Sequence, residues 1–180
     1  VNSITLANGT NGGLAANYSI STGQTTTADV TAKSLTVSGI TASNKTYDAT
    51  TTATLNTGSV TYTGLVSGDV FNGTYTGAFS DKNVGTGKTV TITPSYTGAD
   101  VSNYSVTDHS TITADIAAKA LTATASASNK TYDGTTTATT TLTFSGLVGS
   151  ETLGQTVGST FNNKNVGTGK TVTVNSITLA

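Results

Sequence analysis

The sequence lacks cysteine, methionine, tryptophan and arginine altogether, and it holds one proline and one histidine in 180 residues. Without cysteine, a disulfide framework, a thiolate metal site and a cysteine nucleophile are all excluded. With His109 as the only histidine, a catalytic triad or a multi-histidine metal site is nearly excluded as well. No nucleophile–base pair or pair of acids stands at a usable spacing, so we expect no enzymatic activity, no cofactor and no metal centre.

Charged residues are also scarce. Eight lysines and nine acidic residues make up 9% of the chain, and the net charge is −1. A nucleic-acid-binding surface needs a basic stripe, which scattered lysines do not provide. No apolar run approaches the about 18 residues of a membrane helix. We therefore expect neither nucleic acid nor a membrane span.

Threonine is the commonest residue, and with valine and isoleucine it favours extended backbone, because branching at Cβ restricts χ1. Seven tyrosines and four phenylalanines argue against disorder. Turn residues separate short apolar runs, a pattern that predicts an all-β chain of small β-sandwiches, Ig-like or as partly open barrels. The expected strands are residues 34–40, 50–55, 59–65, 69–75, 88–93, 104–107 and 110–116, then 120–125, 135–144, 153–157 and 170–178. Pro94 falls late in a strand, where an edge position or a bulge is expected.

The chain repeats itself with a period of about 86 residues, which suits a whole small β domain. Residues 44–48 (NKTYD) recur as residues 129–133, and residues 82–90 (KNVGTGKTV) recur as residues 164–172. Residues 17–19 (NYS) recur as 103–105, and residues 28–33 resemble residues 114–119.

These spacings predict a complete repeat at residues 34–119, preceded by the C-terminal third of a repeat at 1–33 and followed by the N-terminal two-thirds of one at 120–180. An alternative frame gives two complete structural units, 1–89 and 90–180. Residues 1–7 also recur as 174–180, so we expect a piece of a longer array. No signal peptide is expected, because Val1 opens a strand-like segment.

The junction between repeats has neither glycine nor proline from Thr111 to Ser126, so it is not a flexible linker. Its apolar residues move from even positions (112, 114 and 116) to odd ones (121, 123 and 125). Because a shift of one residue turns a strand's apolar face over, we expect a strand that leaves one core and enters the next. That arrangement predicts a stiff, elongated rod.

Residues 129–136, Phe161 and residues 165–172 resemble the YDG-type repeats of large bacterial surface proteins similar to filamentous haemagglutinin. Residues 103–105 and 113–116 resemble that family's closing segments. The resemblance implies export from a Gram-negative cell, often by two-partner secretion, and a role in adhesion or surface fibres. The motif residues expected to be structural are Tyr47, Asp48, Tyr132, Asp133, Gly134, Gly85, Gly87, Gly167, Gly169, Tyr18 and Tyr104. Ala49 stands where Gly134 stands, and it is strained if that position needs a positive φ.

Two motifs look functional but have a simpler structural explanation. Residues 85–89 (GTGKT) lack the first glycine of a phosphate-binding loop and precede a strand, so we expect a hairpin turn. In Tyr47-Asp48 and Tyr132-Asp133, we expect the tyrosine to pack its ring into the core and bond its hydroxyl. The aspartate is expected to close an Asx-type turn.

Several minor sites stay open alternatives. Calcium could bind between units, although no acidic run is present. Lys45 or Lys130 could form an isopeptide bond with an Asn or Asp if the lysine were buried. Six N-x-[ST] sequons could accept glycans. His109 is expected to be a solvated loop residue.

We expect the protein to be a structural repeat of a large extracellular adhesin or matrix fibre, acting as a stiff spacer or a fibre-forming module. Its partners would be neighbouring repeats and other copies of the protein, through exposed sheet edges that carry few lysines. The alternative is a carbohydrate- or mucin-binding module, in which exposed Tyr62, Tyr75 and Tyr96 form a platform for a host or matrix glycan.

Overall fold

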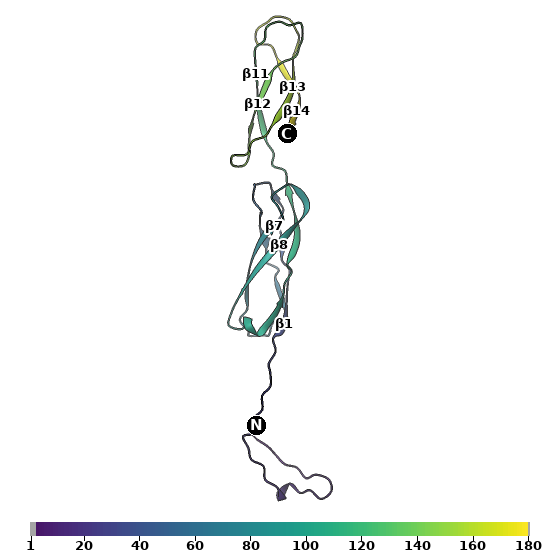
Figure 1. Cartoon of the computed structure of the whole chain (residues 1–180), viewed down its shortest axis with the longest axis vertical. Coiled ribbons are helices and arrows are strands. Elements are labelled where there is room, and N and C mark those ends of the chain that lie inside the picture. The colour runs from purple at the N-terminus through teal and green to yellow at the C-terminus, as the bar shows by residue number, and fades with distance from the viewer. Residues whose placement is uncertain (1–2, 180) are drawn as a thin grey trace.

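The computed structural model describes residues 3–179, which form strands, loops and two short 3-10 turns. The expectation of an all-β chain is confirmed, and one sheet is nearly barrel-shaped. No helix in this range is long and apolar enough to cross a membrane. Three stretches follow one another along the long axis of Figure 1: an N-terminal segment (residues 3–32), a closed unit (33–117) and an open unit (118–179).

The closed unit contains three sheets. Its strands are β1 (Lys33–Ser38), β2 (Thr41–Ala42), β3 (Lys45–Thr46), β4 (Thr52–Ala53), β5 (Leu55–Asn56), β6 (Thr61–Thr63), β7 (Asn72–Phe79), β8 (Gly85–Thr97), β9 (Tyr104–Thr107) and β10 (Thr111–Ala117). Their orders are β6-β1-β9, β3-β10-β8-β7-β4 and β2-β5. The 3-10 turn η2 (Val101–Asn103) precedes β9.

Two long-range pairings run parallel. β9 lies parallel to β1, with Lys33 opposite Tyr104, and β10 lies parallel to β3, with Lys45 opposite Ile116. All other strand pairs are antiparallel, including the long β7–β8 hairpin and the β8–β10 pair. The last two strands of the unit, β9 and β10, therefore pair with strands from its beginning, β1 and β3, in its two larger sheets.

Buried and exposed residues alternate along the strands of the closed unit, and the buried ones form its core. In β1, Leu35 and Val37 are 0% and 2% exposed, while Thr36 between them faces solvent. Three clusters fill the interior, centred on Val90 with Ile116, on Leu35 with Phe71, and on Val37 with Ile92.

The open unit consists of two hairpins, β11 (Thr122–Ala127) with β12 (Thr140–Ser145) and β13 (Gln155–Phe161) with β14 (Val172–Leu179). Its buried apolar side chains are Ala138 and Leu142. All six residues of β11 are exposed. The expectation that the strand after the junction enters a second core is therefore wrong for β11, although Ala114 and Ile116 before the junction are buried as expected.

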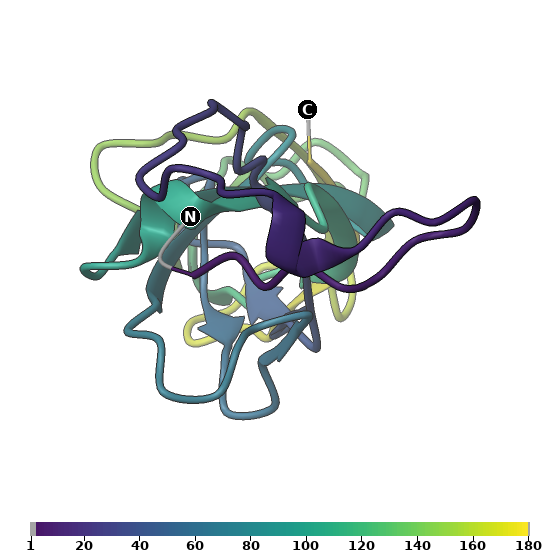
Figure 2. The same cartoon turned by 90° about the horizontal axis from the view of Figure 1, so that it is seen from below.

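The N-terminal segment carries one regular element, the 3-10 turn η1 (Ala15–Asn17). Figure 1 places it beyond the end of the closed unit that lies away from the open unit, and Figure 2 views it along that axis. The strand expected to open at Val1 falls partly outside the described residues, and residues 3–7 form no strand.

Strand boundaries differ from the expected ones where the chain changes sheets. The run 50–55 is split into β4 and β5, which join different sheets. β8 extends to Thr97 and includes Pro94, which pairs with Tyr75 on β7. β10 pairs with β8 only as far as Thr91, so Pro94 occupies a local edge as expected, where its missing N–H interrupts no ladder.

Candidate functional site

The repeated NKTYD motif forms a tight turn in which the motif lysine bonds the motif aspartate and the threonine that follows. We call this arrangement the lysine clamp. Lys45 Nζ donates to Asp48 Oδ1 at 2.7 Å, to the Thr50 carbonyl at 2.8 Å and to the Thr52 carbonyl at 3.1 Å. The Thr50 N–H and hydroxyl both donate to Asp48 Oδ1 at 2.9 Å, which is the Asx-type turn expected. The ammonium also lies 5.4 Å from the centre of the Phe79 ring.

The open unit repeats the lysine clamp almost atom for atom. Lys130 Nζ donates to Asp133 Oδ1 at 2.8 Å and to the Thr135 carbonyl at 3.0 Å, and it lies 5.6 Å from the Phe161 ring centre. Thr135 donates to Asp133 Oδ1 from both its N–H and its hydroxyl. The geometry therefore depends on local contacts.

Each lysine clamp lowers the pKa of its aspartate. The hydrogen bond from Lys45, followed by those from Thr50, lowers the pKa of Asp48 to about 2. The matching bonds from Lys130 and Thr135 lower the pKa of Asp133 to about 2. Both carboxylates are thus held ionised as acceptors, which suits a structural role better than proton transfer near neutral pH.

The residue after each motif aspartate adopts a left-handed backbone. Ala49 has φ 64° and Gly134 has φ 77°. The two turns have the same shape, so the alanine carries the strain expected for a side chain in this region.

The two motif tyrosines lie in different surroundings. Tyr47 packs against the closed unit's core and donates its hydroxyl to Glu151 Oε1 at 2.5 Å, across the junction between units. Glu151 also lies 3.7 Å from Lys82 Nζ. The hydrogen bond to Glu151 raises the pKa of Tyr47. Tyr132 is 58% exposed, so its expected packing into a core is wrong here.

The repeated GTGKT motif lies in different surroundings in the two units. Gly87, with φ 58°, sits at a register shift between β8 and β10, and its N–H donates to Asp115 Oδ1 at 2.7 Å. Lys88 Nζ bonds Asp81 at 2.8 Å. Residues 85–89 lie inside β8, so the hairpin turn expected at this motif is wrong in the closed unit, where the turn between β7 and β8 falls before Gly85. In the open unit the matching glycines, Gly167 and Gly169, lie in the loop between β13 and β14, as expected, and Gly169 has φ 62°.

The two tyrosines of the NYS motif differ most in burial. Tyr104 is 8% exposed, donates to Asp69 Oδ2 at 2.6 Å and accepts the Val66 N–H at 2.9 Å. Burial, and then the bond to Asp69, raise the pKa of Tyr104. Tyr18 is 69% exposed.

The tyrosines expected to form a glycan platform are packed instead. Tyr62 and Tyr96 have ring centres 5.3 and 5.0 Å from that of Phe71, and the Tyr75 hydroxyl lies 3.2 Å from that of Tyr62. All three rings are half-buried against the core clusters. Burial raises the pKa of Tyr75 and Tyr96, with the Asp108 carboxylate adding to the effect at Tyr96. The expectation of an exposed platform is therefore wrong.

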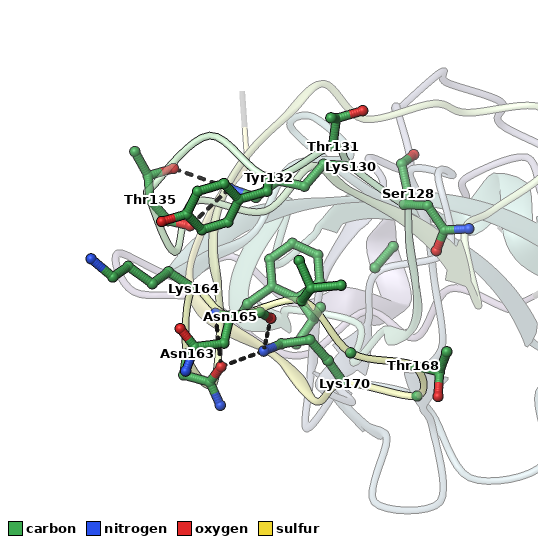
Figure 3. A pocket seen from close by; sticks show the side chains of 17 residues that line it. Ser128, Lys130, Thr131, Tyr132, Thr135, Asn163, Lys164, Asn165, Thr168 and Lys170 are labelled. Atoms are coloured by element: carbon green, nitrogen blue, oxygen red, sulfur yellow. Dashed lines mark hydrogen bonds between the residues drawn. The ribbon is translucent and has the colours of Figure 1, made fainter.

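A cavity of about 670 Å³ lies in the open unit beside the lysine clamp. Figure 3 shows Lys130 and Tyr132 on one side of it and Asn163 and Lys170 on the other. Three lysines and no acidic residue line this cavity, Lys164 being the third. Within residues 3–179, no group of three or more His, Cys, Asp or Glu could hold a metal, and His109 is exposed in a loop.

Two contacts were missed from the sequence. The bond between Tyr47 and Glu151 joins residues 104 apart, and Asp115 ties Gly87 to Asn44, whose Oδ1 accepts the Asp115 N–H at 2.7 Å. The repeat aligns Glu151 with Asp69, because residues 64–66 and 146–148 are both GLV, but Asp69 is the partner of Tyr104 within one repeat, so the alignment gives no signal for the bond to Tyr47.

Comparison with curated proteins and with solved structures found no match. Comparison with protein families matched the YDG domain to residues 31–114 and again to residues 117–180. The two matches cover most of the chain and both lysine clamps. The chain therefore belongs to the YDG domain family.

Proposed function

We propose that the chain is a structural repeat of a large extracellular bacterial adhesin or matrix fibre, where it acts as a stiff spacer or fibre-forming module. Its membership of the YDG family and its resemblance to repeats of filamentous-haemagglutinin-like surface proteins support this proposal, with two-partner secretion as the proposed export route. The motif residues also support it, because most of them hold turns or strands and leave few polar groups for chemistry.

The observation that carries the proposal is the contact between consecutive repeats. Tyr47 and Lys82 of one repeat meet Glu151 of the next, across a junction that contains no glycine or proline. An apolar pocket of about 270 Å³, lined by Val84, Leu121 and Leu147 among others, lies at the same place. Such contacts limit bending between neighbours, as in other linear repeat arrays.

Electron microscopy of the source cells, labelled with an antibody to residues 34–119, tests the location. Label along surface fibres or stalks is the expected result. Label confined to the cell interior would overturn the proposal.

Small-angle X-ray scattering tests the stiffness. Tyr47→Phe removes the hydroxyl that bonds Glu151, so we expect a broader distribution of interatomic distances than in the wild type. Tyr132→Phe is the matched control, because that tyrosine is 58% exposed. Identical curves for all three proteins would count against a fixed junction.

A further inference from the structure

Tyrosines carry the most easily oxidised side chains of this protein. Cysteine, methionine and tryptophan, which compete with tyrosine for oxidants in most proteins, are absent, whereas seven tyrosines are present. Without cysteine, oxidation cannot produce a disulfide. An oxidant that removes electrons from the folded chain therefore acts first on tyrosine rings, and these are the side chains that it can join covalently.

Two tyrosines of the closed unit meet at their hydroxyl groups. Tyr62 lies on β6, in the three-stranded sheet, and Tyr75 lies on β7, in the five-stranded sheet. Their hydroxyl oxygens are 3.2 Å apart in a part-buried contact between residues 13 positions apart. The contact therefore bridges the two larger sheets of the unit.

A glycine makes room for this pair of hydroxyls. A Cβ atom at Gly73 would lie 2.3 Å from the Tyr75 hydroxyl oxygen and 2.8 Å from that of Tyr62. Gly73 stands two residues before Tyr75 on β7, so both face the same side of the strand. Its φ is not positive, so the strand itself does not require a glycine here. The missing side chain matters for the space that it leaves to the two hydroxyls.

The aromatic neighbours hold the pair in a half-buried position. The Tyr62 ring packs edge-on against Phe71, with ring centres 5.3 Å apart and planes at 64°. The Tyr75 ring meets that of Tyr96 at 6.1 Å and 78°. The Tyr96 hydroxyl has a partner of its own, because it donates to the Asp108 carboxylate. Tyr96 is therefore a neighbour of the pair in the same cluster.

The repeat itself does not require two tyrosines at these positions. Counting 82 positions on, which is the offset between the two KNVGTGKTV motifs, the open unit has Phe144 in place of Tyr62 and Val157 in place of Tyr75. Gln155 stands there in place of the glycine. The hydroxyl pair and its glycine are thus particular to one copy, and the turns and strands shared by both copies do not explain them.

We propose that Tyr62 and Tyr75 are joined by oxidation into a dityrosine, through a carbon–carbon bond between the ring carbons next to their hydroxyls. Each phenol gives up one electron and its hydroxyl proton, the two ring radicals couple, and the hydrogen on each coupled carbon moves to the oxygen. The linked product has two hydrogen atoms fewer than the two separate tyrosines. One molecule of hydrogen peroxide, activated by a haem peroxidase, accepts the two electrons and two protons and becomes two molecules of water.

The observed contact resembles the linked product. In dityrosine the two hydroxyls stand on the carbons next to the new bond, so they are neighbours, as they are here at 3.2 Å. The new bond fastens β6 to β7 and closes a loop in the unfolded chain, which stabilises the unit as a disulfide would. The inference does not depend on where the protein resides.

Treatment of the full chain, at high dilution, with a haem peroxidase and hydrogen peroxide tests the cross-link. We expect dityrosine fluorescence in the monomer fraction, a mass lower by two hydrogen atoms, and residue 62 still attached to residue 75 after the chain is cut at Phe71. Dilution limits coupling between molecules through Tyr18 and Tyr132, which are 69% and 58% exposed. Dityrosine confined to dimers and larger species would overturn the inference.

Three variants test the assigned pair, with circular dichroism to verify that each one folds. Tyr62→Phe should abolish the linked monomer, because phenylalanine has no hydroxyl hydrogen to lose. Tyr96→Phe, a change in the same cluster, should leave it. Gly73→Ala keeps all seven tyrosines but separates the two hydroxyls, so the yield of linked monomer should fall severalfold. A linked monomer in Tyr62→Phe, its loss in Tyr96→Phe, or an unchanged yield in Gly73→Ala would contradict the assignment.

Discussion

The closed and open units share their motifs and turns but not their cores. Both lysine clamps share the bonds to the aspartate and to the threonine two residues after it, while eleven of the thirteen buried apolar side chains in residues 3–179 belong to the closed unit. The turns are formed by residues within about one motif length of each other, and they persist without a complete sheet. Burial requires the strands that come last in the repeat, as Ala114 and Ile116 show. Local sequence therefore sets the turns, and the final third of the repeat sets the core.

The largest expected contrast comes from truncating the same phenylalanine in each unit. Phe79→Ala removes a ring that is 3% exposed, and we expect it to lower the free energy of unfolding of the closed unit by about 3–5 kcal/mol. Phe161 is half-buried beside the cavity, so Phe161→Ala should cost roughly half of that or less. Urea unfolding followed by NMR signals of each unit measures both. Equal losses would mean that the open unit is as well packed as the closed one.

A smaller contrast is expected at the NYS tyrosines. Tyr104→Phe leaves Asp69 and the Val66 N–H without their buried partner, at a cost of about 1–3 kcal/mol. Tyr18→Phe should change the stability of the single molecule by less than about 0.5 kcal/mol, because its side chain is exposed. Thermal unfolding followed by circular dichroism distinguishes the two. A similar loss in both variants would contradict the difference in burial.

At the motif turn, two substitutions are expected to change the stability of their units in opposite directions. Ala49→Gly relieves a left-handed alanine and should stabilise the closed unit by about 1 kcal/mol. Gly134→Ala introduces the same strain and should destabilise the open unit by about as much. Amide hydrogen exchange, read separately for each unit, tests both signs. Two changes of the same sign would show that the turns differ.

The smallest effect is expected from pH, and here the two units should agree. The pKa values of Asp48 and Asp133 are both about 2, below the usual aspartate value of 3.8. Their contribution to stability is therefore present above about pH 4 and lost as the pH falls through 2. NMR titration of the two carboxyls should give matching midpoints. Midpoints that differ by more than one pH unit would tie the lysine clamp to closure of the unit.

Sequence patterns predicted the parts that local chemistry decides. The β-rich composition and the Asx-type turn at Asp48 follow from residue type and the repeat alone. The backbone at Ala49 did not follow from them, because an alanine in place of Gly134 left open whether the two turns have the same shape. The strand at residues 104–107 was predicted with its observed bounds, because it is short and flanked by turn residues.

The features that could not be predicted from the sequence depend on contacts between residues far apart in the chain. Tyr62, Tyr75 and Tyr96 look like any exposed aromatic residues of a strand, and it is their packing on the core clusters and on one another that half-buries them. The exposure of β11 and Tyr132 depends on strands that residues 118–179 do not contain. The bond from Tyr47 to Glu151 depends on how two repeats meet, which periodicity within one repeat does not encode.

The parallel pairings of the closed unit also bear on how it resists being pulled. Lys33 faces Tyr104 and Lys45 faces Ile116, so both pairs are 71 residues apart and the start of the unit runs beside its end in one register. Tension along the chain enters at Lys33 and leaves at Ala117, and it drags these two segments past each other in opposite directions. The bonds between them then share the load in shear, whereas a hairpin pulled at its open end gives way one bond at a time. We expect single-molecule pulling to show a high unfolding force for this unit, and a force as low as that of a peeled hairpin would contradict it. A chain of such units would keep its length under an external pulling force until all the hydrogen bonds between a pair of parallel strands broke together.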